Sequence, residues 1–415
     1  MYTLAIALYA FAARLISPFH TKAGKMIKGQ KETFSILKES IDPNARYIWF
    51  HSSSLGEFEQ GRPMMEKIRK EHPELKILLT FFSPSGYEIR KNYKGADVVC
   101  YLPFDLPKNV ERFLQLANPA MAIFIKYEFW MNYLQALRKR QIPTYIISAI
   151  FRTNQSFFRF YGKSQRPVLN CYDWIFVQDE ASRSLLSQYN IHNVSVSGDT
   201  RFDRVCAIYQ NRKELSLVEQ FANPNNSEGK KFTLVAGSTW AKDEDILIDY
   251  FNRHTEIKLI VVPHEIDKER LKSIICKLKR PYICYSEANE NNIRQADCLI
   301  VDCIGLLSSI YRYGEVAYIG GGFGAGIHNL LEAAVYGIPV IFGPNYHKCR
   351  EAKELIENGG GFSIETQYSF DQLFDGFATH SCQLKQAGQI AGNYVLENTG
   401  ATGIIHEEIC KKIIS

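Results

Sequence analysis

Residues 319–344 read IGGGFGAGIHNLLEAAVYGIPVIFGP, and this stretch decides the fold class. An apolar run at 316–319 leads into five glycines within seven residues, a helical segment follows, and a second apolar run occupies 340–342. The order strand, glycine-rich loop, helix and strand is typical of α/β proteins. Glycines let backbone N–H groups approach a ligand, and a helix N-terminus favours an anion such as phosphate. The spacing matches neither the P-loop nor the dinucleotide fingerprint, so the loop alone indicates only an anion near a helix start.

Apolar runs alternate with helical patterns on both sides of this loop. Strands are expected in the first half at 47–50, 77–80, 98–101, 122–125, 144–148 and 174–177, and in the second at 233–236, 259–262, 299–301, 316–319 and 340–342. Helices are expected at 58–70, from about 84, and at 129–139. This alternation predicts right-handed βαβ units in two α/β halves, each with a Rossmann-like parallel sheet. Because ligands bind beyond the carboxyl ends of such strands, we expect the active site in a cleft between the halves.

The polar stretch 208–230, with Asn-Pro-Asn-Asn-Ser at 223–227, is expected to be a linker or loop. The predicted organisation is therefore an N-terminal membrane-associating helix in 1–25, a first domain at 26–210 and a second at 225–395. A C-terminal helix over 396–415 follows, for which packing back on the first domain is one arrangement.

The composition indicates a folded protein with an uneven charge. Of the 415 residues, 46% are hydrophobic and 22% are charged. Residues 1–205 hold 28 Lys and Arg against 18 Asp and Glu, a net charge of +10, whereas the remainder has a net charge of −5. A basic half suggests a polyanionic partner. Basic residues do not alternate with aromatic ones as in RNA-binding proteins, so anionic lipid is favoured over nucleic acid.

The cysteines and histidines favour a reducing compartment without a catalytic metal. The ten cysteines include no CxxC pair and do not form a disulfide framework. The close pair His347 and Cys349 is expected to lie in an ordinary loop, because a tetrahedral site needs a second pair of ligands. No metal and no cofactor are therefore expected.

The first 17 residues are apolar apart from Arg14, and four lysines follow within residues 22–31. The uncharged run is shorter than the ~20 residues that span a bilayer. Its charge follows the apolar run, unlike that of a signal peptide. An interfacial anchor, a short membrane helix and a buried first helix all remain open. Membrane attachment is preferred, since Tyr2 and Tyr9 suit the interface and the lysines suit anionic headgroups.

Two glutamates in the first half are candidate catalytic residues. Glu57 follows the 47–50 strand in SSSLGE, where it either completes a capping box with Ser54 or serves as a general base. We find both interpretations equally supported. Glu128 follows the 122–125 strand, where a carboxylate more often compensates a helix dipole, although it could face the same site as Glu57.

Candidate ligand residues in the second half also follow strands. Ser238 and Thr239 precede a helix and could bind phosphate. Asp243 and Asp245 resemble the metal-binding acidic pair of sugar transferases, but they lie in a helical first turn where acids are common. His264 is expected to be structural. Asn329 and Glu332 fit a capping box, and Glu332 could alternatively accept hydrogen bonds from a ribose diol.

Taken together, these loops resemble one family, the 3-deoxy-D-manno-octulosonic acid (Kdo) transferases of the GT-B fold. The resemblance is carried in order by HSSSLGE (51–57), TFFSPSGYE (80–88), YLPFDLP (101–107), YEFWMN (127–132), SGDTRFDR (197–204), AGSTWAKDE (236–244), VVPH (261–264), VDCIGLL (301–307) and the glycine stretch (320–344). It covers roughly residues 1–360.

The resemblance implies inverting transfer of Kdo from CMP-Kdo to a lipid A precursor in lipopolysaccharide synthesis, at the cytoplasmic face of the inner membrane of a Gram-negative bacterium. It assigns Glu57 as the general base and Glu128 as the second catalytic carboxylate. The implied nucleotide-site residues are Ser238, Thr239, Gly321, Gly322, Gly326, Asn329 and Glu332. The expected partners are CMP-Kdo, the lipid A precursor and an anionic membrane surface, with no metal and no nucleic acid.

The chain departs from the family pattern at four places. Trp240 replaces a histidine, Lys126 replaces a glutamate, Ile327 replaces a glycine, and an arginine expected between Pro263 and His264 is absent. Alternative interpretations are a UDP-sugar transferase or 2-epimerase of the same fold, and a non-catalytic lipid A-binding protein. The number of sugars transferred and the acyl pattern of the acceptor stay open.

Overall fold

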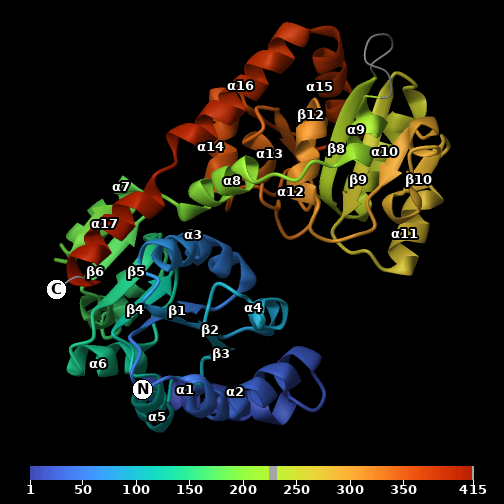
Figure 1. The fold of residues 1–415 in the computed structure, drawn as a ribbon. Helices are drawn as coiled ribbons and strands as arrows, with labels where there is room; N and C mark the ends of the chain where they lie inside the picture. Colours follow the sequence, from blue (N-terminus) through green and yellow to red (C-terminus); the bar gives the residue numbers. More distant parts are fainter. Residues whose placement is uncertain (224–230, 414–415) are drawn as a thin grey trace. The chain divides into compact units, whose positions relative to one another are not determined.

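The computed structural model describes residues 1–223 and 231–413. Unit 1 contains Met1–Arg204 and the segment from Thr399 onward, and unit 2 contains Val205–Asn398 (Figure 1). Each unit is built on its own parallel sheet, as the alternating pattern predicted.

Unit 1 has a seven-stranded sheet with the order β3-β2-β1-β4-β5-β6-β7. Its strands are β1 (Tyr47–Ser52), β2 (Lys76–Phe81), β3 (Val98–Tyr101), β4 (Met121–Ile125), β5 (Thr144–Ala149), β6 (Trp174–Val177) and β7 (Val194–Val196). The recorded strand pairs of this sheet are parallel, and every residue of β1 and β4 is buried. Burial on both faces explains why these strands are continuous apolar runs and do not alternate with polar residues.

Helices cover both faces of this sheet and form two separate apolar clusters with it. The helices of this unit are α1 (Tyr2–Ile16), α2 (Thr21–Ser40), α3 (Leu55–Glu71), α4 (Pro84–Arg90), α5 (Pro107–Ala117), α6 (Met131–Lys139), α7 (Glu180–Ser187) and α17 (Ala401–Ile413), and α8 (Thr200–Gln210) crosses the boundary between the units after Arg204. The last helix, α17, returns to unit 1 and buries Ile405 and Ile409 in the cluster that contains Phe58 of α3. The chain therefore begins and ends in the same unit.

The N-terminal helix α1 packs on unit 1 through one face only. Ala10 and Ala13 are buried in a small cluster with Tyr101 and Phe104, and Tyr2 donates a hydrogen bond to Asp105 at 2.7 Å. Among the described residues, no single helix is long and apolar enough to cross a membrane. The pair α1 and α2 passes that test jointly, with a bend of 115° between the two helices.

Unit 2 has a second seven-stranded sheet with the order β10-β11-β9-β8-β12-β13-β14. Its strands are β8 (Phe232–Thr239), β9 (Ile257–Pro263), β10 (Tyr282–Cys284), β11 (Cys298–Ile300), β12 (Val316–Ile319), β13 (Val340–Phe342) and β14 (Gly361–Ser363). Its helices are α9 (Ser216–Ala222), α10 (Ala241–Arg253), α11 (Lys268–Ile275), α12 (Leu307–Ile310), α13 (Leu331–Ala334), α14 (Arg350–Asn358), α15 (Gln367–Thr379) and α16 (Ser381–Glu397). Leu234, Leu259 and Tyr318 lie in its main apolar cluster.

Two expectations from the sequence are wrong in detail. The stretch 208–230 was expected to be a linker or loop, but it contains α9, which buries Val218 and Phe221. Residues 224–230 of the predicted linker lie outside the described residues. The helix after the glycine loop is the single turn α13, which begins at Leu331, five residues after the last glycine of the loop. So short a helix offers little of the anion-favouring dipole that the sequence suggested.

Candidate functional site

The strand order of unit 1 reverses between β1 and β4, which are adjacent parallel strands. Ligands of open α/β sheets bind beyond the carboxyl ends of strands at such a switch point. Glu57 lies in the first turn of α3, the helix that follows β1, and Glu128 lies in the loop after β4. The fold therefore brings both predicted glutamates to the position where a parallel sheet usually holds its ligand.

Glu57 lies in the first turn of α3 and reaches back to the helix start. Its Oε2 accepts the backbone N–H of Ser54 at 2.9 Å and the Ser54 hydroxyl at 3.1 Å. Burial, reinforced by the charge of Glu128, raises the pKa of Glu57 to about 6. The capping contact is thus present, yet it uses one carboxylate oxygen only. A carboxylate with this pKa is a better proton acceptor than an ordinary surface glutamate, so the two interpretations of Glu57 are compatible.

Glu128 is buried, with 3% of its surface exposed. Its Oε2 accepts the indole N–H of Trp130, and its backbone carbonyl accepts the Tyr172 hydroxyl. The neighbouring Lys126 has a φ of 71°, a left-handed conformation that is strained for a lysine. Such strain is tolerated where surrounding contacts fix the backbone, and it is common at functional sites.

The imidazole of His51, on β1, connects the loop after β4 to β2 of the sheet. Its Nε2 lies 3.1 Å from Glu128 Oε2, and its Nδ1 lies 2.8 Å from the Thr80 hydroxyl. Thr80 also accepts the indole N–H of Trp49. The Thr80 hydroxyl also donates to the Phe50 carbonyl at 3.3 Å. Sequence analysis did not single out His51, although HSSSLGE contains it.

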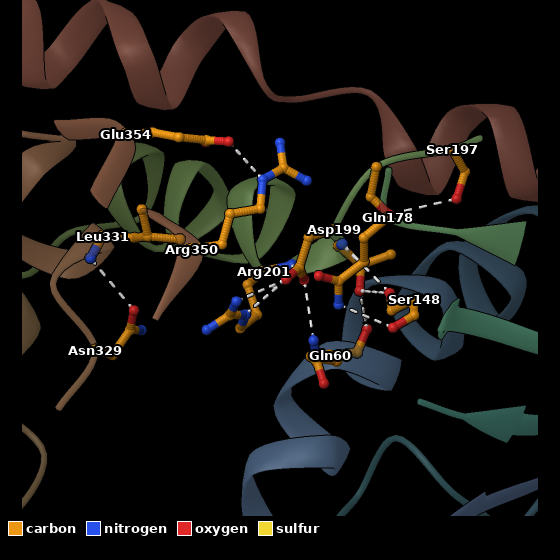
Figure 2. Close-up of polar contacts among 12 residues, drawn as sticks. Gln60, Ser148, Gln178, Ser197, Asp199, Arg201, Asn329, Leu331, Arg350 and Glu354 are labelled. Atoms are coloured by element: carbon orange, nitrogen blue, oxygen red, sulfur yellow. Dashed lines mark hydrogen bonds and ion pairs between the residues drawn. The ribbon is translucent and has the colours of Figure 1, made fainter. Parts of the chain in front are cut away.

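A second polar network at the carboxyl side of this sheet fixes an arginine (Figure 2). Asp199 Oδ1 accepts Gln60 Nε2 at 3.1 Å, and Asp199 Oδ2 accepts Arg201 Nε at 2.8 Å. Burial raises the pKa of Asp199, but the charge of Arg201 together with the hydrogen bonds from Arg201 and Gln60 lowers it below its usual value. Burial raises the pKa of the neighbouring Tyr127, and the charges of Arg152 and Arg201 oppose this shift.

In unit 2 the strand order reverses between β8 and β12, which are also adjacent. Ser238 and Thr239 end β8, and the glycine loop follows β12. Ser238 has a φ of 53°, at an irregularity in the pairing of β8 with β9. Thr239 is buried and donates to Glu244 Oε1 at 2.8 Å, and Arg270 contacts the same oxygen at 2.6 Å. Of the predicted pair, Ser238 is thus the more accessible to a ligand.

Asp243 anchors the glycine loop and takes no part in an acidic metal pair. Its carboxylate is buried and accepts the backbone N–H groups of Trp240 and Gly321 and the hydroxyl of Tyr318, at 2.7–3.0 Å. Asp245 instead is 62% exposed and pairs with Lys277. The two carboxylates serve different partners, in agreement with the first-turn interpretation.

The amides of the glycine loop are partly used within the protein. Gly321 donates to Asp243, and Gly326 donates to the Gly321 carbonyl at 3.2 Å, so these two N–H groups are not available to a phosphate. Gly321 has a φ of 93°, which favours glycine, and a Cβ on Gly322 would lie 2.5 Å from the backbone nitrogen of Gly343. The assignment of Gly321, Gly322 and Gly326 to the nucleotide site stays a prediction. It cannot rely on the N–H groups of Gly321 and Gly326, and rests on the close approach of the glycine backbone to a ligand.

Asn329 and Glu332 form a side-chain pair at the start of α13. Asn329 Nδ2 donates to Glu332 Oε1 at 2.9 Å, while Asn329 Oδ1 accepts the Leu331 N–H at 3.3 Å (Figure 2). The two side chains do not form the expected capping box of α13, because the N-cap residue of this helix is Leu330 and not Asn329. Glu332 as a ribose ligand stays a prediction.

An aromatic stack that sequence analysis missed lies beside these residues. The ring of His264 stacks against Trp240, with centroids 4.8 Å apart, and against His328, with centroids 4.3 Å apart. Trp240 Nε1 also donates to His328 Nε2 at 3.1 Å. Burial, helped by His264, lowers the pKa of His328 and favours its neutral form. Trp240 is 38% exposed, so the stack presents a flat surface to a ligand.

Comparison with known proteins agrees with this arrangement. Residues 28–204 match the family model described as 3-deoxy-D-manno-octulosonic-acid transferase (kdotransferase). Similar proteins named 3-deoxy-D-manno-octulosonic acid transferase include one from Aquifex aeolicus, 29% identical over 80% of this chain and 85% of that protein. Another, from Haemophilus influenzae, is 24% identical over 89% of this chain and 88% of that protein. The chain is thus similar to the Kdo transferases over most of its length, and residues 28–204 match their family model.

The fold is likewise that expected of Kdo transferases, the GT-B fold. UDP-GlcNAc 2-epimerase from Neisseria meningitidis superposes with a TM-score of 0.62 at 15% identity, over 88% of this chain and all of that one. A glycosyltransferase from Rickettsia africae superposes with a TM-score of 0.56 at 13% identity, over 90% of this chain and 99% of that one. At these identities the likeness concerns the fold alone.

Two departures from the Kdo transferase pattern now have a structural setting. Trp240, in place of histidine, stacks on His264, so the aromatic character of this position is retained. Lys126, in place of glutamate, extends its ammonium over the Tyr127 ring, 5.3 Å from the centroid. Nothing in the structure explains Ile327.

Proposed function

We propose that this Kdo glycosyltransferase transfers Kdo from CMP-Kdo to a lipid A precursor with inversion, and that Glu57 is the general base. The observation that carries the proposal is the placement of Glu57 and Glu128 after β1 and β4, together with the pKa of about 6 for Glu57. Two carboxylates in different environments can take different roles in one reaction.

In the proposed reaction, a hydroxyl oxygen of the acceptor attacks the anomeric carbon of Kdo. Glu57 accepts the hydroxyl proton as the new C–O bond forms, and the bond from the anomeric carbon to the CMP phosphate breaks. The bonding electrons leave with CMP. Positive charge develops at the sugar ring in an oxocarbenium-like transition state. The fixed carboxylate of Glu128 would stabilise this charge.

We assign donor binding to unit 2 and place it at the β8/β12 switch point. Ser238 offers a hydroxyl and a strained backbone, and the Trp240, His264 and His328 rings form a surface on which a pyrimidine base can stack. Neutral His328 and polar groups would receive the single phosphate of CMP without a metal ion. Asn329 and Glu332 remain the proposed ribose contacts.

We further propose that unit 1 lies on an anionic membrane surface, at the cytoplasmic face of the inner membrane, through α1. Leu4, Leu8, Phe11 and Leu15 recur at helical spacing and are each 59–65% exposed. Phe19, just after the helix, is 91% exposed. An exposed apolar face of this size marks an interaction site, and the four lysines at 22–31 suit anionic headgroups. A surface-bound enzyme could reach a lipid acceptor in the same membrane.

The test is to incubate the purified chain with CMP-Kdo and a lipid A precursor in detergent and to measure the mass of the lipid product. A mass increase by one or more Kdo units supports the proposal. Products from UDP-sugars but not from CMP-Kdo would favour the alternative GT-B enzyme. Lipid binding without product at any protein concentration would favour a non-catalytic lipid A-binding protein.

A further inference from the structure

A cluster of nitrogen and sulfur ligands lies in unit 1, where α3 ends against α17. His72 directly follows α3, and His406 and Cys410 lie one turn apart on α17. Cys410 Sγ lies 3.3 Å from His72 Nε2 and 3.2 Å from His406 Nε2. The three ligand atoms all lie within 4.8 Å of one another.

These separations are close to those of a tetrahedral metal site. With Zn–S bonds of about 2.3 Å and Zn–N bonds of about 2.0–2.1 Å, tetrahedral angles place neighbouring ligand atoms roughly 3.3–3.6 Å apart. A small adjustment of the side chains would therefore leave room for an ion between the two imidazoles and the thiolate. Hydrogen bonds to sulfur are weak, so the cluster gains little from its present contacts alone.

Glu71, the last residue of α3, can serve as a fourth ligand. Its Oε2 lies 3.5 Å from His406 Nε2, while its Oε1 pairs with Lys67 at 2.7 Å. His72 Nδ1 in turn lies 3.5 Å from Oε1 of the exposed Glu74, which is close enough for a small shift to let this carboxylate orient a metal-bound imidazole. The side chains of His72 and His406 are only 15% and 8% exposed. The cluster thus has ligands, an outer partner and partial shielding from solvent.

We propose that His72, His406 and Cys410 bind one divalent transition-metal ion of the Zn²⁺ type, with Glu71 as the fourth ligand. Two imidazoles and a thiolate select zinc and similar ions over Mg²⁺ and Ca²⁺, which prefer oxygen ligands. Binding releases the Cys410 thiol proton to solvent, and no redox change is involved.

The role of this site is structural. It clips α17, the helix that returns from the end of unit 2, onto α3 of unit 1. Glu57 lies in the first turn of α3 and His72 follows its last residue, so about 20 Å of helix separates them at 1.5 Å per residue. The ion would therefore stabilise the unit without entering the transfer reaction.

The sequence does not reveal this metal site by the usual spacing of metal ligands. His406 and Cys410 are spaced i and i+4 on one helix, which places both on the same face. Their third partner lies more than 300 positions earlier in the chain, and no CxxC or HxxH pair announces it.

The test uses the full chain, treated with chelator, desalted, and titrated with Co²⁺, whose bond to thiolate gives a charge-transfer absorption in the near ultraviolet. We expect a band that saturates at one Co²⁺ per chain, is displaced by Zn²⁺, and disappears in Cys410→Ser. His72→Gln, at a less buried position, should weaken Co²⁺ binding at least tenfold. Cys382→Ser, at an exposed cysteine of unit 2, is the matched control and should retain the band.

Thermal unfolding gives a second measurement. Zn²⁺ should raise the Tm of the chelator-treated wild type and of Cys382→Ser, but not that of folded Cys410→Ser or His72→Gln. No thiolate band in the wild type, or an unchanged band in both Cys410→Ser and His72→Gln, would overturn the proposal. Neither measurement depends on transferase activity, so the two proposals fail separately.

Discussion

His51 Nε2 lies 3.1 Å from Glu128 Oε2, and both side chains are buried. This contact joins β1 to the loop after β4 at the switch point of the first sheet. It fixes the carboxylate whose charge contributes to the raised pKa of Glu57. The charges of Glu128 and His51 therefore both influence the pKa of Glu57, and substitutions of the three residues should have distinct consequences.

Replacing His51 by leucine should destabilise unit 1. The substitution removes the hydrogen bond between the imidazole and the Thr80 hydroxyl and the contact with Glu128, at a cost of about 0.5–1.5 kcal/mol. The shift in the midpoint of urea unfolding measures it. His192→Leu, at an exposed histidine of the same unit, should change stability by less than about 0.5 kcal/mol. Equal midpoints for wild type and His51→Leu would argue against a structural role of the contact.

Transfer should show an acidic limb that reports Glu57. A general base must be ionised, so kcat/KM should fall as the pH drops through about 6. Because the Glu128 charge helps to raise the pKa of Glu57, residual activity of Glu128→Gln should show this limb at lower pH. Glu66→Gln, at an exposed position of α3, should leave the limb in place. If the limb does not move in Glu128→Gln, the charge of Glu128 does not raise the pKa of the catalytic base.

The contribution of Glu57 to the folding stability of the protein has the opposite dependence on pH. The folded-state pKa of Glu57 is raised, so the native protein holds this proton more tightly than the unfolded chain does. Ionisation of Glu57 therefore costs stability as the pH rises from the unfolded pKa to about 6.

Asp243→Asn should destabilise unit 2, whereas Asp245→Asn should not. The asparagine amide would face N–H donors where the Asp243 carboxylate accepts Trp240 and Gly321, with an expected loss of about 2 kcal/mol or more. Asp245 is 62% exposed, so its substitution should be nearly neutral. Chemical denaturation of the two variants decides the point. A similar loss of activity in both variants, restored by added divalent metal, would instead revive the acidic-pair interpretation.

Membrane binding should depend on the exposed face of α1. Leu8→Glu places a charge at a position that is 62% exposed and should weaken binding to anionic vesicles at least tenfold in a sedimentation assay. Ile304→Glu, in unit 2 at 88% exposure, is the control and should bind as wild type. If both variants sediment like the wild type, α1 is not the docking element.

Much of the fold could be predicted from the sequence, because the central strands are apolar on both faces. Strands such as β1, β4, β8 and β12 were found as uninterrupted apolar runs. The strands that were missed, β7, β10 and β14, have three residues each and lie at sheet edges. A partly buried run of three residues is too short to distinguish a strand from a loop by its pattern, whereas the four-residue edge strand β3 was recognised.

The candidate site was only partly predictable. Glu57 and Glu128 follow recognisable strands, so their position at the strand ends could be derived. The contact of His51 with Glu128 could not be derived, because it joins segments that are distant in the sequence. The same holds for the contact of Asp243 with Gly321 in unit 2. The stack of Trp240, His264 and His328 likewise combines segments that follow three different strands. Sequence spacing alone does not reveal such contacts.

The most direct test of the account is the rate of Kdo transfer by Glu57→Gln, measured in a single turnover with CMP-Kdo and a lipid A precursor. Glutamine retains an oxygen that can accept the Ser54 N–H, so folding should persist, as circular dichroism would show. We predict a rate at least 100-fold below that of wild type and of Glu66→Gln. A folded Glu57→Gln variant that transfers Kdo at the wild-type rate would contradict the account and leave Glu57 as a helix cap.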